Sequence, residues 1–196
     1  MIILLDNGHG FDTPGKRSPD GHLREYAYNR YLAFRICERL QQLGLDCRLL
    51  VPEREDISLQ ERCRRVNKIC QRFGVGQVIL ISIHINAAGN GQQWMDARGW
   101  SCFTSVGETR ADSLATCLYD AAKAQLPGHN IRKDYTDGDP DIEKNFYILR
   151  HTRCPAVLTE NLFMDCREDV AFLESAEGSQ AIVNLHVEGI LHYLSL

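Results

Sequence analysis

Four side chains of this sequence could together hold and use a catalytic metal ion: His9, Glu25, His84 and Glu160. Two imidazoles and two carboxylates are enough for three protein ligands on a zinc ion and one remaining acid–base group. A catalytic zinc keeps its fourth position open for water or substrate. These residue types therefore indicate a metalloenzyme, provided that the fold brings the four positions together.

Short apolar runs come shortly before three of these residues and predict how they could meet. Such runs are typical of buried strands in a parallel sheet. Ligands of open α/β sheets bind outside the carboxyl ends of the strands, so the polar residues that follow the runs are expected at one sheet edge. The runs span residues 2–5, 78–83 and 156–158.

The same positions also have ordinary structural interpretations. His9 lies between glycines in the segment 6–10 and could belong to a simple turn. Glu25 extends the apolar face of a predicted helix, where a buried carboxylate must be paired or coordinated, although the helix dipole also favours an acid there. His84 could be a core histidine, and Asn86 could support the site, bond to a substrate or stabilise a turn. Their joint occurrence favours the metalloenzyme.

The remaining periodicities predict one α/β domain over residues 1–196. Its mostly parallel, twisted sheet has about six strands with helices on both faces, which makes three layers. Apolar residues at 3.6-residue spacing predict the main helices, and the segment 127–145 lacks periodicity and predicts a long surface loop. Residues 147–149 predict a short strand or turn. Further strands are expected at 45–51, 77–85 and 99–104, and helices at 25–43, from 58 to 73, at 110–125, at 167–174 and at 178–194.

Ser58 and Glu61 match the capping box, in which the serine accepts a hydrogen bond from an early helix amide and the glutamate reaches back to the amide of the capping residue.

The charge of the chain argues against one class of partner. The net charge of −4 argues against nucleic-acid binding. The basic cluster Arg62, Arg64, Arg65 and Lys68 is interpreted as the solvated face of a helix.

The eight cysteines form no C-x-x-C pair, which argues against zinc-finger and thioredoxin sites. Most are expected to be free buried thiols, because several fall on apolar faces. No signal peptide and no membrane span are expected, since no apolar stretch has the required length. The sequence makes no prediction of the oligomeric state.

At this point the ordered motifs resemble a known family almost from end to end. The chain is similar to the zinc-dependent N-acetylmuramoyl-L-alanine amidases of the amidase-3 type, which trim bacterial peptidoglycan. Two departures occur inside the motifs: Asn7 stands where proline is common, and Leu162 where glycine is common. The motifs are D-x-G-H-G at 6–10, G-x-x-x-E at 21–25, R-x-x-D…L…R…N at 54–67, S-I-H-x-N-A at 82–87 and P-A-V-L-x-E-x-x-F at 155–163.

The resemblance implies a role for each site residue. His9, Glu25 and His84 would bind one Zn²⁺ per chain, and Glu160 would be the catalytic acid–base residue. Asn86 and Arg132 are further candidates to contact the substrate or to support the metal ligands. The implied substrate is peptidoglycan or its muropeptides, cut at the amide that joins N-acetylmuramic acid to L-alanine.

Two other functions stay open at this point. One is a zinc carboxypeptidase-like peptidase of similar fold, although its H-x-x-E spacing is absent here. The other is an inactive peptidoglycan-binding module, which would be expected to lack a ligand or the free carboxylate. The expected place of action is the cell wall, reached by lysin-like release or, if a leader was removed, in the periplasm.

Overall fold

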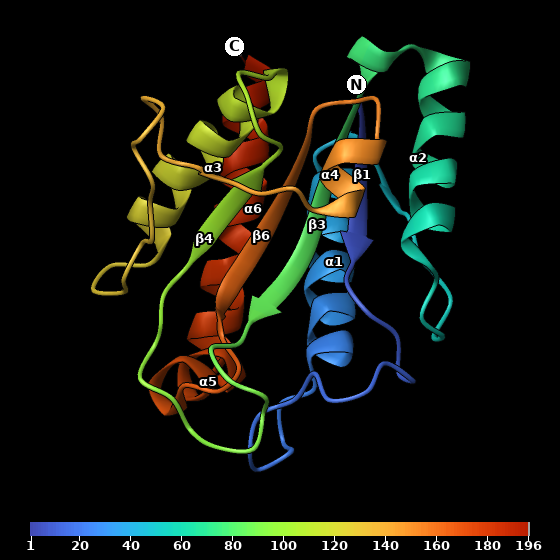
Figure 1. Cartoon of the computed structure of the whole chain (residues 1–196). Coiled ribbons are helices and arrows are strands. Elements are labelled where there is room, and N and C mark those ends of the chain that lie inside the picture. The colour runs from blue at the N-terminus through green and yellow to red at the C-terminus, as the bar shows by residue number, and fades with distance from the viewer. Residues whose placement is uncertain (196) are drawn as a thin grey trace.

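A six-stranded sheet forms the centre of the computed structural model, which describes residues 1–195 (Figure 1). The strand order is β2-β1-β3-β6-β4-β5. The first four of these run parallel, and β4 is antiparallel to β6. The strands are β1 (Ile2–Asn7), β2 (Asp46–Leu49), β3 (Val78–Asn86), β4 (Ser101–Thr104), β5 (Ile142–Glu143) and β6 (Ala156–Phe163).

Helices cover both faces of the sheet and complete the predicted three layers. Helices α1, α3 and α6 pack on one face, whereas α2 and α4 pack on the other. Figure 1 views the molecule from the α2/α4 side, with the carboxyl ends of β1 and β3 pointing downward. The helices are α1 (Glu25–Gln42), α2 (Leu59–Phe73), α3 (Arg110–Gln125), α4 (Tyr147–His151), α5 (Arg167–Glu174) and α6 (Ala176–Ser195), with a 3₁₀ turn at Val75–Gln77.

Alternation along the buried strands divides the core into two clusters. On β3, Ile79 and Ile81 contribute to the cluster under α1, α3 and α6, whereas Val78 and Leu80 contribute to the cluster under α2 and α4. Successive side chains of a strand point to opposite faces, so a strand buried on both faces must be apolar throughout. By the same rule, the even-numbered His84 projects toward the α2/α4 side.

Two predictions for the segment before β6 are wrong. Residues 142–143 lie in the region predicted as a loop, yet they form β5, whose Ile142 pairs with Phe103 of β4. Residues 147–149 were predicted as a strand or turn and instead begin α4. β5 has two residues and α4 has five. Segments this short do not repeat a hydrophobic pattern often enough for the sequence to reveal them.

The capping box predicted before α2 is only half formed. The Ser58 hydroxyl oxygen accepts a hydrogen bond from the backbone N–H of Glu61 at 3.3 Å. The Glu61 carboxylate instead accepts hydrogen bonds from Arg64 and Arg65, three and four residues further along the helix. The start of the helix is therefore as predicted, but the glutamate stabilises the helix surface.

All eight cysteines are buried, and within residues 1–195 each is a free thiol, as predicted. None of the helices in this part of the chain combines the length and apolarity needed to cross a bilayer.

Candidate metal and catalytic site

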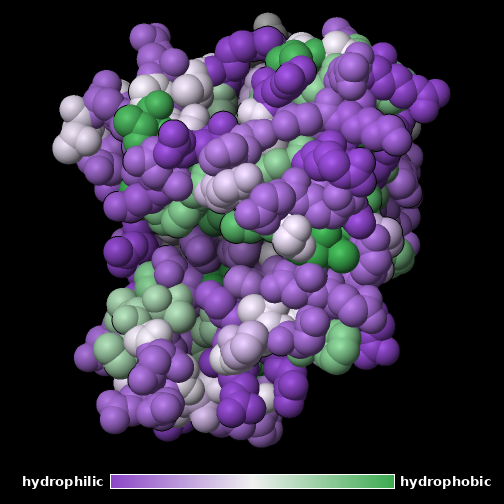
Figure 2. Space-filling view, turned by 45° about the vertical axis from the view of Figure 1, so that its right-hand side comes forward, coloured by the Kyte–Doolittle hydropathy of each residue, from purple (hydrophilic) through white to green (hydrophobic). Residues whose placement is uncertain are grey.

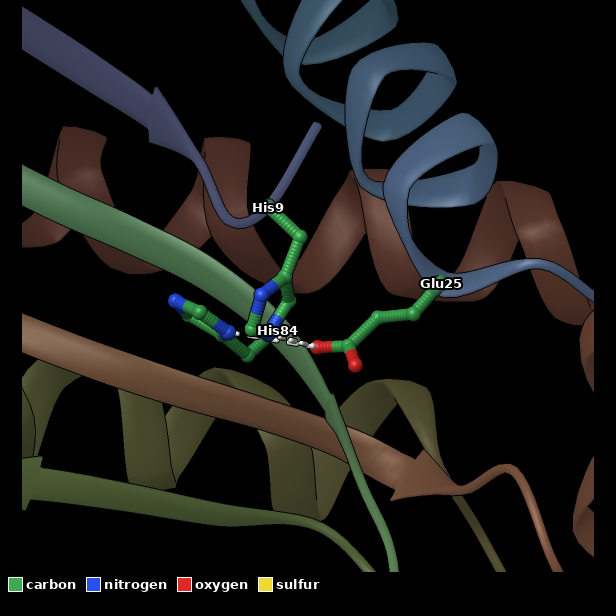
Figure 3. Close-up of side chains that lie close together, drawn as sticks. All are labelled: His9, Glu25 and His84. Carbon is green, nitrogen blue, oxygen red and sulfur yellow. Dashed lines mark hydrogen bonds and ion pairs between the residues drawn. The ribbon is translucent and has the colours of Figure 1, made fainter. Parts of the chain in front are cut away.

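Three of the four predicted site residues meet at the carboxyl edge of the sheet. His9 follows β1, Glu25 begins α1 and His84 lies near the end of β3 (Figure 3). Each offers one nitrogen or oxygen atom such that these atoms lie within 4.8 Å of one another. Oε1 of Glu25 is 3.4 Å from Nε2 of His9 and 3.2 Å from Nδ1 of His84. The edge of the sheet therefore assembles a His–Glu–His group from three separate segments.

The backbone around His9 adopts a geometry that presents its ring to this group. His9 has a φ of 66°, in the left-handed region that residues other than glycine rarely occupy. The N–H of the preceding Gly8 donates to the carbonyl of Ile83 at 3.0 Å, which fastens the end of β1 to β3. Strained backbone of this kind is concentrated at functional sites, where surrounding contacts hold it in place.

Glu25 is the buried centre of the group. Its side chain is 1% exposed, and Oε1 also accepts a hydrogen bond from the N–H of Ile85 at 3.1 Å. Its second oxygen, Oε2, is buried and has no hydrogen-bond partner among residues 1–195. An unpaired buried carboxylate oxygen is costly, so this atom favours a site that is completed by a cation.

The Glu25 carboxylate and the two histidines change each other's ionisation. Burial raises the pKa of Glu25, but hydrogen bonds from His84 and His9 outweigh burial and hold that pKa far below its usual range. Burial disfavours the charged form of His84, yet the bond to Glu25 and its negative charge raise the pKa of His84 overall. The ionised carboxylate therefore attracts positive charge to the point where the rings meet, and a metal ion would compete there with protons.

Glu160 lies beside this group and stands outside the set of mutually close donor atoms. It is the register partner of His84 across the parallel strands β6 and β3, so both side chains project from the same face. Burial raises the pKa of Glu160 to about 7, against the opposing effect of His84. Its Oε2 is buried without a hydrogen-bond partner in the described chain. Glu160 can therefore accept and return a proton near neutral pH.

Arg62 corrects one prediction, because it is not part of a solvated basic face. Its side chain is 2% exposed and forms an ion pair with Asp6 at 2.5 Å and another with Asp56 at 3.1 Å. It also donates to the carbonyl of Asn7 at 2.8 Å. Asp56 in turn accepts a bond from Thr13 in the loop after His9. Arg62 thus ties α2 to the segment that carries the first histidine.

The sequence offered one signal for this role. Arg62 falls within the R-x-x-D…L…R…N segment of the resemblance, together with Asp56. Helical periodicity alone could not separate it from Arg64 and Arg65, which are partly exposed and pair with Glu61.

A chain of buried hydrogen bonds supports the opposite face of the sheet behind the site. Asn161 donates to the carbonyl of His84 at 3.0 Å and to the hydroxyl of Thr159 at 3.2 Å. Its side-chain oxygen accepts from Trp100 at 2.9 Å. Nε2 of His186 lies 3.0 Å from the hydroxyl oxygen of Thr159. These hydrogen bonds hold the backbone that carries His84 in place.

Asn86 and Arg132 were predicted to contact the substrate or support the ligands. A register shift separates His84 from Asn86, whose strand partner is Phe163 and whose side-chain oxygen accepts from the N–H of Ala87. The guanidinium of Arg132 lies over the ring of Phe163, 5.3 Å from its centroid. Both residues are therefore connected to the end of β6, and their predicted roles stay predictions.

A cavity of about 390 Å³ opens beside the two histidines. The space-filling view is hydrophilic over most of its visible face, which is hollowed between the main body and a smaller lower part (Figure 2). Leu59 at the start of α2 is 46% exposed beside the cavity. The wall of the cavity includes Gly8, His9, Asp56, Ile57, Leu59 and His84.

Residues 3–192 match the family model Amidase_3, described as N-acetylmuramoyl-L-alanine amidase. The chain belongs to this amidase family. The match covers all four predicted site residues and agrees with the resemblance drawn from the motifs.

Two relatives align along nearly the whole chain. It is 32% identical over 203 residues to an endolysin of Bacillus phage SPP1, an alignment that covers 100% of this chain and 66% of the endolysin. It is 24% identical to the sporulation-specific N-acetylmuramoyl-L-alanine amidase of Bacillus subtilis (strain 168), over 96% of this chain and 66% of that protein. The chain thus spans slightly less than two thirds of the length of these two relatives.

Solved structures confirm the fold of the amidase family for this chain. The N-acetylmuramoyl-L-alanine amidase AmiC2 of Nostoc punctiforme superposes with a TM-score of 0.82 and 24% identity, covering 100% of this chain and 98% of that one. The corresponding amidase from Clostridium difficile 630 gives a TM-score of 0.81 and 23% identity, covering 99% and 96%. The predicted α/β architecture is therefore confirmed.

Proposed function

We propose that this chain is the catalytic region of a zinc-dependent N-acetylmuramoyl-L-alanine amidase that acts on bacterial peptidoglycan. The observation that supports this proposal is the His9–Glu25–His84 group in a chain of the amidase family. Beside the group lies Glu160, whose buried Oε2 has no hydrogen-bond partner among residues 1–195. This arrangement supplies both a metal site and an independent acid–base group. The proposed bond is the amide between the lactyl group of N-acetylmuramic acid and the first L-alanine of the stem peptide.

The residues of the group fit zinc by their chemistry. Two imidazoles and one carboxylate are a frequent ligand set for catalytic zinc. The buried Oε2 of Glu25 has no hydrogen-bond partner within residues 1–195. One ion per chain is proposed, held by His9, Glu25 and His84. When bound, zinc would supply Lewis-acid polarisation of the scissile carbonyl and make water a stronger acid.

Glu160 is proposed to move the proton. Its carboxylate takes a proton from the attacking water as the new C–O bond forms, and it returns that proton to the amide nitrogen as the C–N bond breaks. A pKa near 7 suits both steps, because the group can accept and donate at neutral pH. Acid–base help of this kind contributes about 10²–10⁴-fold to the rate.

Substrate binding is proposed at the same edge of the sheet. The cavity beside His9 and His84 lies next to the metal group, and its wall combines the apolar Ile57 and Leu59 with the polar Asp56. Asn86 and Arg132 remain candidates for contacts to the glycan or the peptide. The proposed partner is peptidoglycan or its muropeptides, and the proposed place of action is the cell wall.

Mass spectrometry of peptidoglycan digested by the purified, zinc-loaded protein tests this function. We expect free stem peptides that begin with L-alanine and glycan chains that keep the lactyl group. The Glu160→Gln variant should release these products about 10²–10⁴-fold more slowly, and protein treated with a chelator should release none. Cleavage only within the stem peptide would instead identify a peptidase, and binding without any cleavage would identify a wall-binding module.

A further inference from the structure

Ser101 lies directly beside Glu160 in the sheet. It is the register partner of Glu160 in the antiparallel β4–β6 pair, just as His84 is its partner in the parallel β3–β6 pair. Directly opposed residues of neighbouring strands project from the same face. His84, Glu160 and Ser101 therefore form one row across three adjacent strands, on the face that carries the site.

Within this row, Ser101 and Glu160 each have a buried polar atom without a hydrogen-bond partner among residues 1–195. The hydroxyl of Ser101 is buried in a residue that is 1% exposed, and among residues 1–195 it makes no hydrogen bond. Oε2 of Glu160 is in the same condition. A buried donor or acceptor without a partner is expensive, and most such groups in native proteins are paired.

The two atoms are chemically complementary and within reach. A serine hydroxyl donates one hydrogen bond, and an ionised carboxylate only accepts. Directly opposed Cβ atoms in antiparallel strands lie about 4.5–5.5 Å apart, so rotation about the Cα–Cβ bond of Ser101 can bring its oxygen to the carboxylate. The next residue, Cys102, is paired with Thr159 and points to the other face, and therefore does not compete.

We propose that Ser101 is a positioning residue for Glu160. Its hydroxyl donates a hydrogen bond to Oε2 and holds that oxygen against β4, which leaves the other carboxylate oxygen free to take the proton from water. The proposed contact is argued from the strand register alone, whereas its catalytic consequence rests on the proposed amidase function. Ser101 touches neither the substrate nor the reacting atoms and acts through the carboxylate alone.

A double-mutant cycle in chemical unfolding tests the contact in the metal-free protein, independently of any activity. The cycle combines Ser101→Ala, Glu160→Ala and the double variant. We expect the effect of Ser101→Ala on the unfolding constant to differ roughly tenfold between the wild-type and Glu160→Ala backgrounds, as for a hydrogen bond to a charged group. The matched control, Cys102→Ala on the same strand, should show the same effect in both backgrounds.

Kinetics on a soluble muropeptide tests the positioning role. Ser101→Ala should lower kcat by about 3- to 30-fold with little change in KM or in bound zinc, because only the alignment of Glu160 is lost. Ser101→Thr, which keeps the hydroxyl, should recover most of the turnover. If Ser101→Ala does not fold, Ser101→Cys replaces it, since a thiol has a similar shape and is a weak donor.

The outcomes separate this inference from the proposed function. Equal effects of Ser101→Ala in both backgrounds would overturn the contact, whatever the protein hydrolyses. A coupled cycle with unchanged kcat in Ser101→Ala would overturn the positioning role. Absence of any amide cleavage by the wild-type protein would refute the proposed function, and the unfolding cycle would still decide whether the two side chains are bonded.

Discussion

Gly8 and the imidazole of His84 lie so close together that no side chain fits at position 8. A Cβ atom on Gly8 would lie 2.1 Å from Cε1 of His84 and 2.5 Å from both of its ring nitrogens. The N–H of Gly8 also donates to the carbonyl of Ile83, the residue before His84. The end of one ligand-bearing strand therefore determines where the ring of the other ligand can lie.

Gly8→Ala should weaken zinc binding by roughly 10- to 100-fold, the usual range when the support of a metal ligand is disturbed. The added methyl group must displace the ring of His84 or separate β1 from β3. Titration of the metal-free protein with zinc in the presence of a competing chelator measures the affinity. Gly76→Ala is the control, because its Cβ would meet its nearest atom, Nη1 of Arg110, at 3.7 Å. Wild-type affinity in Gly8→Ala would contradict this account of the site.

Arg62→Ala should cost about 3–5 kcal/mol of unfolding free energy, because it leaves the buried Asp6 carboxylate without its cation. Arg64→Ala should change the unfolding free energy far less, since that side chain is 66% exposed and pairs with Glu61 on the helix surface. Urea unfolding of the two variants measures both values. Equal losses would mean that the buried arginine contributes no more than its exposed neighbour.

His186 should make the protein less stable in mild acid. Burial lowers the pKa of His186 to about 4, below its ordinary value of about 6.5. Between these values the unfolded chain binds the extra proton and the folded chain does not, so this contribution to stability is lost as the pH falls through 6.5 toward 4. The loss at pH 5 relative to pH 7.5 should be about 2 kcal/mol.

The variant His186→Gln isolates this effect, because glutamine does not titrate and can still accept a bond from Thr159. Urea unfolding at both pH values should show a smaller acid loss in the variant than in the wild type. Identical losses in the two proteins would show that His186 is not the group responsible.

At position 162, a glycine variant should be more stable than an alanine variant, which is the reverse of the usual order in a strand. Leu162 is fully buried, yet its φ is 68°, and the family resemblance places a glycine at this position. Leu162→Ala keeps the strained backbone and loses about 3 kcal/mol of packing. Leu162→Gly loses the same packing but relieves the strain, and should be more stable than the alanine variant by about 1 kcal/mol.

Leu158, also buried on β6, is the matched control for this comparison. At this ordinary strand position, glycine should be less stable than alanine by roughly 0.5–1 kcal/mol. Urea unfolding measures the stability of all four variants. If glycine and alanine rank in the same order at positions 158 and 162, backbone strain at Leu162 does not explain the result.

The sequence predicts the parallel part of the fold well because its signals are long. β3 has nine residues and α1 has eighteen. Their hydrophobic patterns repeat often enough to predict a strand and a helix without knowledge of the tertiary contacts. The two residues of β5 carry no pattern of their own, and their pairing depends on β4. α4 has only five residues, too few for a periodic pattern, although its Ile148 and Leu149 are buried.

The site was predictable for a related reason. His9 follows β1, and His84 and Glu160 lie in the carboxyl-terminal halves of β3 and β6, so the parallel topology places all three near one edge of the sheet. The structure brings the two histidines together with Glu25. Burial of Arg62 was not predictable from its helix, because its partner Asp6 lies 56 residues away in the sequence. The pairing of Ser101 with Glu160 depends on an antiparallel strand whose direction no local pattern specifies.

The zinc content of the Glu160→Gln variant tests the division of roles in the site most directly. Wild type, Glu160→Gln and His84→Ala are loaded with zinc, freed of excess metal and analysed by elemental mass spectrometry, with amide cleavage measured on the same samples. We expect about one zinc per chain in Glu160→Gln, with turnover reduced by about 10²–10⁴-fold, and far less than one zinc in His84→Ala. Loss of zinc from Glu160→Gln to the level of His84→Ala would make Glu160 a metal ligand and contradict the account.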